Sequence, residues 1–495
     1  MRIVLPFVLA SAFQAALSRT FDTFNYTETT IDKLQDAIVS QKLSVKEIVQ
    51  HYLDVIDQLN HKGPQLNGVI ETSPTALAQA IAQDRNGTRS GLLHGIPILI
   101  KDNIATTGDG LTACAGSFAM EGNIAPRDAF LVQKLRAAGA IVLGHANMVE
   151  WANWRSVTDT VDWRYHPPLL TMFQTNSSRS ARGGITKNPY VLTAPTTGSS
   201  SDPALTVAAN MIPVAIGTES GLPMGRTVAD VARVLQAIAG FDPTDSASKD
   251  APVPEYSQTY NALTSLKNVR VAISKQANDY TTNENLSPAH VNAFNKGVET
   301  LKKLGADIVY APYPNAAAIS KSECDYVAMT TEFKVDLEAY LSTLTWKEGV
   351  TPMKTLQDIT DYNAAHPDTE LNVLDQSLML QSLNSPNKTS STYLDALALC
   401  QDLAVTNGIE KYIKDTQADV IFALTLTWSL APNSPGYHSI AGWPILSVPL
   451  GYDHSVPFGV SFVTPKYHEE KLLQNGYLFE QSTKARVAPQ FLPDN

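Results

Sequence analysis

The sequence predicts a layered α/β fold, in which helices alternate with strands that are buried on both faces. Apolar residues recur at helical intervals between Ile31 and Gln58, separated by polar positions. Residues 94–100 instead form a short continuous apolar run, which is typical of a fully buried strand. In 128–143 and again in 298–310, a helical pattern ends at a glycine and an apolar run follows. This alternation favours a sheet covered by helices.

Further strands are expected from apolar runs in the second half of the chain, at 269–273, 420–424, 445–448 and 458–463. Two stretches do not fit the alternation. Residues 157–177 show neither helical nor strand periodicity and contain consecutive prolines, so we interpret them as an anomalous insertion. Residues 311–400 carry no interpretable motif, and we expect them to form a variable region on the substrate side.

Composition indicates one large globular domain. The chain has 495 residues, of which 44% are hydrophobic and 17% charged, and no Gly/Ser-rich or Pro-rich linker divides it. We therefore expect a single domain over residues 19–495. The net charge of -11 and the absence of a basic cluster argue against a nucleic-acid partner. Oligomeric state cannot be read from these features.

The first residues have the pattern of a secretory leader. Arg2 precedes the apolar stretch 3–17, which is interrupted by Ser11 and Gln14 and ends in small residues. About 15 apolar residues fall short of the roughly 20 that a spanning helix needs, so a membrane anchor is the weaker alternative. We interpret residues 1–18 as a cleaved signal peptide and expect a secreted protein.

Glycosylation sequons and cysteines also bear on whether the protein is secreted. Three cysteines, Cys114, Cys324 and Cys400, permit at most one disulfide, and neither they nor the ten histidines show a metal-ligand spacing. We therefore expect no metal. Sequons that fit a secreted glycoprotein begin at Asn25, Asn86, Asn176, Asn285 and Asn387.

Three motifs, in this order and spacing, resemble the amidase signature family. They are GIPILIKDN at 95–103, GSSS at 198–201 and AANMIPVAIGTE at 208–219. Segments 128–151, 226–230, 240–243 and the C-terminal GWPILSVPLG and PFGVSFV agree, so the resemblance covers nearly all of residues 30–490. It implies an α/β/α fold with a mixed central sheet, and hydrolysis of the carbon–nitrogen bond of a small amide without a cofactor.

The resemblance also implies a catalytic set of one lysine and two serines. Lys101 matches the base, and Ser199 matches the bridging serine that a cis peptide bond joins to its predecessor, with Ser200 beside it as a less favoured candidate. A lysine in a dry pocket loses its charge because desolvation disfavours the ammonium. The neutral amine can then draw a proton through the bridging serine from the nucleophile. Asp202-Pro203 departs from the family, which usually has glycine and a small residue there.

The segment that should carry the nucleophile is absent from its expected place. The family's nucleophile lies in a glycine-rich turn roughly two dozen positions beyond the bridging serine, which here is Pro223. Proline offers neither a hydroxyl nor an N–H to an oxyanion. Instead, Glu219 is followed at once by residues 220–227, which resemble a motif normally found later. We therefore expect a deletion after Glu219, with Ser220 as a weak substitute nucleophile.

Two explanations of this deletion are open. The chain is a pseudoenzyme, or coding sequence after Glu219 was removed as an intron while 157–177 was retained as exon; we favour the second. The alternative function is a non-catalytic protein that binds small amides. An amidotransferase component shares the signature, but a secretory leader disfavours it. His145 is expected to be structural, and Glu150 and Trp151 to serve packing or hydrogen bonding.

Overall fold

The structure is a computed structural model that describes residues 24–156, 178–218, 222–275, 286–319, 321–372, 374–425 and 436–493. The expected signal peptide, the insertion 157–177, Ser220, and the sequons at Asn176 and Asn285 lie outside these residues. Among the helices described, none combines the length and the apolar character needed to cross a membrane.

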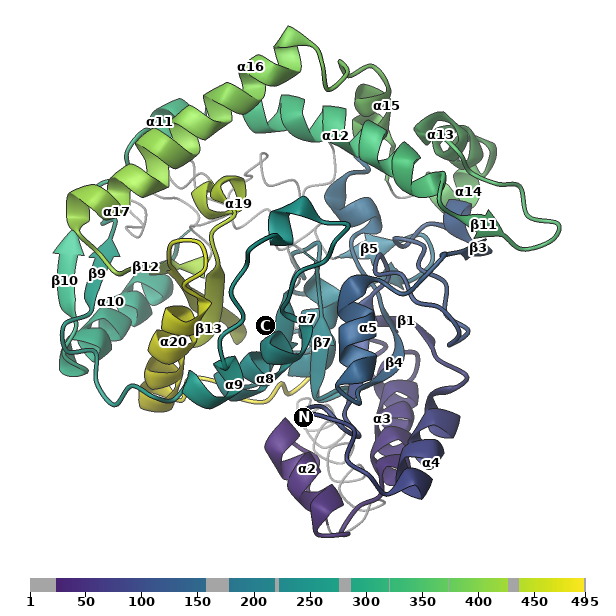
Figure 1. Cartoon of the computed structure of the whole chain (residues 1–495), viewed down its shortest axis with the longest axis horizontal. Coiled ribbons are helices and arrows are strands. Elements are labelled where there is room, and N and C mark those ends of the chain that lie inside the picture. Colours follow the sequence, from purple (N-terminus) through teal and green to yellow (C-terminus); the bar gives the residue numbers. More distant parts are fainter. Residues whose placement is uncertain are drawn as a thin grey trace, which may run out of the picture.

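Two helices form from the amphipathic pattern near the N-terminus, as predicted. They are α2 (Ile31–Val39) and α3 (Val45–Leu59), and each buries its apolar face. A capping box fixes the start of α3: the Ser44 side chain accepts from the Glu47 backbone N–H, and the Glu47 carboxylate accepts from the Ser44 backbone N–H. These helices and α4 (Ala76–Asn86) lie together at one end of the molecule (Figure 1).

The first sheet has five strands in the order β1-β4-β2-β7-β8. The central strand β2 runs parallel to β4 and β7, whereas the edge strands β1 and β8 are antiparallel to their neighbours. The carboxyl ends of β2, β4 and β7 therefore meet at one edge of the sheet. The strands span Val69–Thr72 (β1), Pro97–Lys101 (β2), Ile141–Ala146 (β4), Val214–Ile216 (β7) and Pro223–Gly225 (β8).

The second sheet also has five strands, in the order β10-β9-β12-β14-β13. Its core is rich in aromatic residues: the rings of Phe422, Phe462 and Phe479 pack against one another with centroids 5.0 to 5.6 Å apart. The strands span Arg270–Ile273 (β9), Asp307–Tyr310 (β10), Val420–Leu424 (β12), Ile445–Asp453 (β13) and Val456–Val463 (β14).

Helices cover both sheets. The helix α8 (Val228–Ile238) is shared between the two cores, since Val228 and Ala232 belong to the core of the second sheet and Val234, Ala237 and Ile238 to that of the first. The other covering helices are α5 (Phe130–Ala137), α7 (Ser201–Ala208), α9 (Tyr256–Thr259), α10 (Pro288–Lys303) and α20 (Glu469–Thr483). Small ribbons pair β3 (Asn123–Ile124) with β11 (Thr345–Trp346) and β5 (Arg179–Ser180) with β6 (Gly184–Ile185).

The region that showed no sequence motif folds into an arc of helices at the opposite end from α2 to α4 (Figure 1). Two long helices dominate it, α12 (Cys324–Leu341) and α16 (Ser391–Cys400), and a disulfide between Cys324 and Cys400 joins them. Its shorter helices are α11 (Ala316–Ile319), α13 (Leu356–Ala365), α14 (Pro367–Glu370) and α15 (Ser377–Leu383). A π-helix (Gln401–Ile409), α17 (Glu410–Thr416) and α19 (Tyr437–Ala441) follow it in sequence.

The predicted α/β fold class is confirmed, and the strands expected from apolar runs are present. Among the described residues, these strands form two separate five-stranded sheets, and each contains both parallel and antiparallel pairs. The predicted single domain and the substrate-side role of 311–400 stay predictions.

Candidate active site

Lys101 ends the buried strand β2, and its side chain lies among hydroxyl groups. Its Nζ is 2.8 Å from Ser199 Oγ and 2.9 Å from Ser200 Oγ, although these serines lie 98 and 99 residues away in sequence. Lys101 is fully buried, whereas both serines are half-buried. The peptide bond between Gly198 and Ser199 is cis. The structure therefore brings together the residues that the sequence proposed as base and bridging serine.

Thr218 is a third hydroxyl in this cluster that sequence reasoning did not identify. Lys101 Nζ donates to its Oγ1 at 2.8 Å, and Asn103 Nδ2 does so at 3.2 Å. The sequence did hold a signal. Strand β7 is a parallel neighbour of β2, with Ile100 opposite Ile216, so residues just after β7 lie at the same sheet edge as Lys101.

The two serines differ in their hydrogen bonds. Ser200 Oγ donates to the Thr218 carbonyl and accepts from the Thr218 backbone N–H, both at 3.2 Å. These bonds tie Ser200 to the end of β7. Ser199 Oγ has Lys101 as its hydrogen-bond partner among the described residues. Its own proton and remaining lone pair are therefore available to another group.

The position where the family's nucleophile was expected lies in a strand. Pro223 is the first residue of β8 and pairs with Ile216 of β7, and the Leu222 carbonyl accepts from the Gly217 backbone N–H at 2.9 Å. The connection between β7 and β8 is thus limited to residues 217–222. Ser220, the weak substitute, lies outside the described residues.

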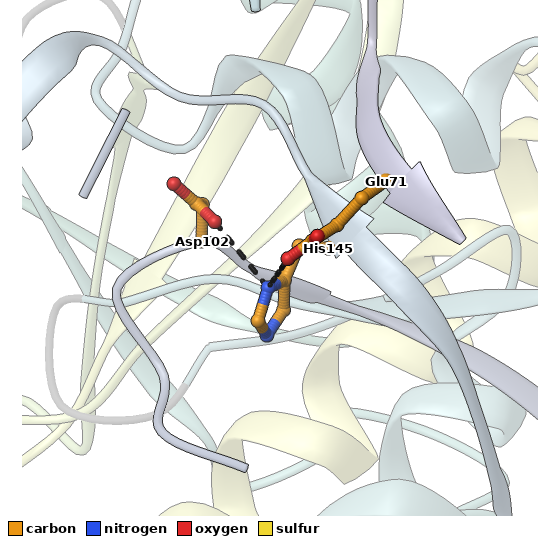
Figure 2. Close-up of side chains that lie close together, drawn as sticks. All are labelled: Glu71, Asp102 and His145. Carbon is orange, nitrogen blue, oxygen red and sulfur yellow. Dashed lines mark hydrogen bonds and ion pairs between the residues drawn. The ribbon is translucent and has the colours of Figure 1, made fainter. Parts of the chain in front are cut away.

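A second polar cluster lies around Asp102, the residue that follows Lys101 in sequence; Figure 2 shows Asp102 with Glu71 and His145. His145 Nδ1 is 2.9 Å from Glu71 Oε1 and 3.3 Å from Asp102 Oδ1, and Arg182 Nη1 is 3.2 Å from the same Asp102 oxygen. Burial by itself lowers the pKa of His145, but hydrogen bonds and charges from Asp102 and Glu71 outweigh it and raise the pKa to about 9. His145 is therefore an imidazolium at neutral pH.

Glu71, Asp102 and His145 are also a set of donors that could surround a metal ion, because one ligand atom of each lies within 4.8 Å of the others. In this structure, however, each of these donors already has an ion-pair partner: His145 lies beside both carboxylates, and Arg182 is 3.2 Å from Asp102 and 3.8 Å from Glu71. The chemistry of the set fits a network of ion pairs better than a metal centre.

Glu150 and Trp151 connect the sheet edge to the helical arc. The Glu150 carboxylate pairs with the fully buried Arg155, which also lies 3.2 Å from Glu370 at the end of α14. The Trp151 ring packs edge-on against Phe333 of α12, with centroids 6.3 Å apart. Both residues thus have the packing and hydrogen-bonding roles that were expected, and His145 has a structural one.

Comparison with known proteins identifies the family of this chain. The family model described as Amidase matches residues 47–221 and 223–473, which is most of the chain. The chain belongs to the amidase family. The predicted resemblance to amidase signature enzymes is therefore confirmed. Membership supports hydrolysis of amide carbon–nitrogen bonds in small substrates as the general chemistry of the family.

Relatives and solved structures agree over nearly the whole length. A probable amidase of Arabidopsis thaliana is 32% identical, covering 98% of this chain and 96% of the relative. A component of the glutamyl-tRNA(Gln) amidotransferase of Pseudomonas syringae pv. tomato is 27% identical, over 92% and 97%. The structure of a peptide amidase from Stenotrophomonas maltophilia superposes with a TM-score of 0.83 at 31% identity, covering 94% of this chain and 99% of that one.

Proposed function

We propose that this chain derives from, and in its intact form is, a hydrolase that cleaves the carbon–nitrogen bond of a small linear amide, with Lys101 as base and Ser199 as bridging serine. One observation carries the proposal: the amine of the fully buried Lys101 lies 2.8 Å from the hydroxyl of Ser199. The similarity to a peptide amidase supports an amide of a peptide-like molecule as substrate.

In the proposed reaction, a proton first moves toward Lys101 and later returns to the departing amine. The neutral Lys101 amine takes the Ser199 hydroxyl proton, and Ser199 takes the proton of the nucleophile as that group bonds to the amide carbon. When the carbon–nitrogen bond breaks, the proton returns through Ser199 to the departing amine. Water then hydrolyses the acyl group by the same path. Neither step requires a metal or an organic cofactor.

The second candidate is a non-catalytic protein that binds small amides. The short connection between β7 and β8 favours it, since residues 217–222 leave no length for a glycine-rich turn followed by a strand. Two measurements separate the candidates. Hydrolytic activity is tested with purified protein on small linear and peptide amides, and reactive hydroxyls with a fluorophosphonate probe. Turnover or labelling that is lost in Ser199→Ala supports the hydrolase. Ligand binding without either supports the binding protein.

Sequencing of the transcript across codons 150–230 tests the origin of the deletion. A transcript that encodes further residues after Glu219 and lacks 157–177 would show that the intact enzyme carries a nucleophile turn. A transcript identical to this sequence would rule out the splicing explanation and leave the pseudoenzyme.

We also propose that the chain is secreted. Disulfides persist in oxidising compartments, and Cys324 and Cys400 form one. The described sequon residues Asn25, Asn86 and Asn387 are all exposed, as glycosylation requires. Expression with the leader in a eukaryotic host tests this: a peptide glycosidase should lower the apparent mass of protein in the medium. Unglycosylated protein that stays in the cell would contradict it.

A further inference from the structure

The C-terminal segment that follows α20, residues 486–492, lies along residues 189–192. Phe491 and Leu192 pack against the core of the first sheet, so the contact buries apolar surface. Backbone hydrogen bonds also join the two stretches. They run from the Phe491 N–H to the Pro189 carbonyl (3.0 Å), from the Leu492 N–H to the Tyr190 carbonyl (3.1 Å) and from the Leu192 N–H to the Leu492 carbonyl (2.8 Å).

The loop that carries the two serines, residues 197–200, lies between two ordered stretches of chain, and we call it the serine loop. Before it, Asn188 Nδ2 donates to the Pro195 carbonyl at 3.1 Å, which closes the turn formed by residues 188–195. After it, the helix α7 begins. The position of the serine loop therefore depends on what holds these two flanking stretches.

Arg486 contacts both flanking stretches through one guanidinium group. Its Nη1 donates to Tyr190 Oη at 3.2 Å, and its Nη2 donates to the Ala208 carbonyl at 3.1 Å. Ala208 is the last residue of α7. The last carbonyls of a helix have no partner within the helix, and a cation is favourable at that end. One side chain thus joins the chain before the serine loop to the helix after it.

Glu28 fixes the direction of this guanidinium. Nε and Nη2 of Arg486 donate to its two carboxylate oxygens at 2.7 and 2.8 Å, which makes the pair bidentate. Burial alone would raise the pKa of Glu28, but the hydrogen bonding and charge of Arg486 outweigh burial and lower the pKa. Asn210, just beyond α7, holds Glu28 in turn: its side chain accepts from the Glu28 N–H at 2.8 Å and donates to the carboxylate at 2.9 Å.

The Tyr190 hydroxyl links the same stretch to the C-terminal segment a second time. It accepts from Arg486 and donates to the Val487 carbonyl at 2.8 Å. The Val487 N–H donates in turn to Tyr452 Oη at 2.7 Å. The Tyr190 side chain is buried, so these bonds form away from solvent, where they hold the geometry more strictly.

We propose that Arg486 is a positioning residue for the serine loop, which it holds beside Lys101 by fixing the chain on both sides of Ser199. The catalytic consequence rests on the proposed function of Ser199, whereas the placement of the loop does not. Lys101 Nζ lies 2.8 Å from Ser199 Oγ. A displacement of about 1 Å in such a contact is enough to lower a rate about a hundredfold.

Two backbone amides outside the serine loop report its position. The Val149 N–H donates to the Ser199 carbonyl and the Thr218 N–H to Ser200 Oγ, both at 3.2 Å. In Arg486→Met the guanidinium is lost while an apolar side chain remains. We expect both amides to exchange about tenfold faster or more, because the loop that accepts their hydrogen bonds is no longer held on both sides. Hydrogen exchange of the full chain, resolved to single amides by mass spectrometry, measures this.

Arg233→Met is the matched control. Arg233 of α8 pairs with Asp32 of α2, and its side chain is 21% exposed, against 19% for Arg486. A general loss of stability from a broken arginine–carboxylate pair would speed exchange in both variants. The proposal requires faster exchange at Val149 and Thr218 in Arg486→Met and wild-type exchange in Arg233→Met. Unchanged exchange in the first variant, or equal increases in both, would overturn it.

Tyr190→Phe is the second variant, and it decides the question if Arg486→Met does not fold. It removes only the hydroxyl that bonds to Arg486 and Val487 and keeps the buried ring. We expect exchange at Val149 and Thr218 to rise in the same direction but less, because Arg486 keeps its bonds to Glu28 and Ala208. Exchange at the wild-type rate would contradict the proposal.

Kinetics distinguish this inference from the proposed function. Hydrogen exchange does not need turnover, so an inactive wild-type protein would reject the proposed function and leave the test of Arg486 intact. In an active protein, kcat should fall about tenfold or more in Arg486→Met with KM nearly unchanged, since a displaced Ser199 impairs proton transfer rather than substrate binding. An unchanged kcat in that variant would also overturn the proposal.

Discussion

Lys101 and Asp102 are neighbours in sequence, yet each lies in a buried polar cluster of opposite character. Lys101 has the hydroxyls of Ser199, Ser200 and Thr218 among its partners. Asp102 contacts charged groups, Arg182 and protonated His145. A lysine among hydroxyls can gain or lose its proton, because a hydroxyl can hydrogen-bond to either form of the amine. The Asp102 carboxylate is instead held by ion pairs. In the proposed function the first cluster moves protons, whereas the ion pairs of the second hold the strand end in place.

The largest expected effect is that of Lys101→Ala on turnover. Loss of a general base typically lowers the rate by about 10²- to 10⁴-fold, whereas removing this side chain leaves the charges around Asp102 intact. Steady-state kinetics on the intact enzyme and denaturant unfolding measure the two effects. Lys62→Ala, at an exposed position, is the control. Full activity in Lys101→Ala would refute the assigned base.

For Arg182→Met, in contrast to Lys101→Ala, we expect a large loss of stability. It removes a cation from Asp102 and Glu71 and leaves buried negative charge under-compensated, which costs about 3 to 5 kcal/mol of stability. Arg270→Met breaks an exposed pair with Asp307 and should cost less than about 1 kcal/mol. Urea unfolding of both variants checks this. Equal losses of unfolding free energy in the two variants would mean that the buried ion pairs around Asp102 stabilise the protein no more than the exposed pair does.

A third prediction concerns pH and His145. Its pKa is raised to about 9 in the folded protein, so the folded state binds the proton more tightly than the unfolded chain, whose histidine has a pKa near 6.5. The stabilisation is complete below pH 6.5 and is lost as pH rises through 9. The difference in unfolding free energy between wild type and His145→Gln should therefore shrink by up to about 3 kcal/mol across this window. A constant difference would contradict the assigned charge.

The smallest effect is expected for Ser200→Ala. Ser200 is hydrogen-bonded to the Thr218 backbone and contributes one of three hydroxyls around Lys101. Loss of its hydroxyl should therefore raise the activation free energy by about 1 kcal/mol, which lowers kcat by less than tenfold. Ser199→Ala should lower kcat much further, since it interrupts the proposed proton path. Similar losses in the two variants would remove the distinction between bridging and supporting serine.

Much of the fold could be predicted because local patterns determine it. The run at 94–100 has no helical period, and its residues from Pro97 onward belong to the buried strand β2. The pairing of Lys101 with Ser199 was accessible only through the resemblance, since 98 residues separate them. Thr218 was accessible in principle from parallel pairing, but only once β2 and β7 were known to be neighbours.

Other features depend on contacts that no local pattern encodes. Three cysteines left the disulfide pairing open, and the packing of α12 on α16 brings the Cα atoms of Cys324 and Cys400 to 5.6 Å. Asp202 was visible in the sequence only as a departure from the family. Two of its hydroxyl donors, Ser178 and Thr186, flank the β5–β6 ribbon, and the sequence does not place this ribbon beside α7.

The position of helix α8 between the two cores affects how the protein unfolds. Because some of its side chains pack in the core of one sheet and others in the core of the other, neither sheet can lose this helix without exposing apolar surface of the other sheet as well. Residues on α8 should therefore exchange their amide hydrogens only in openings that involve both sheets. The two sheets are expected to behave as one cooperative unit, joined by about three turns of helix.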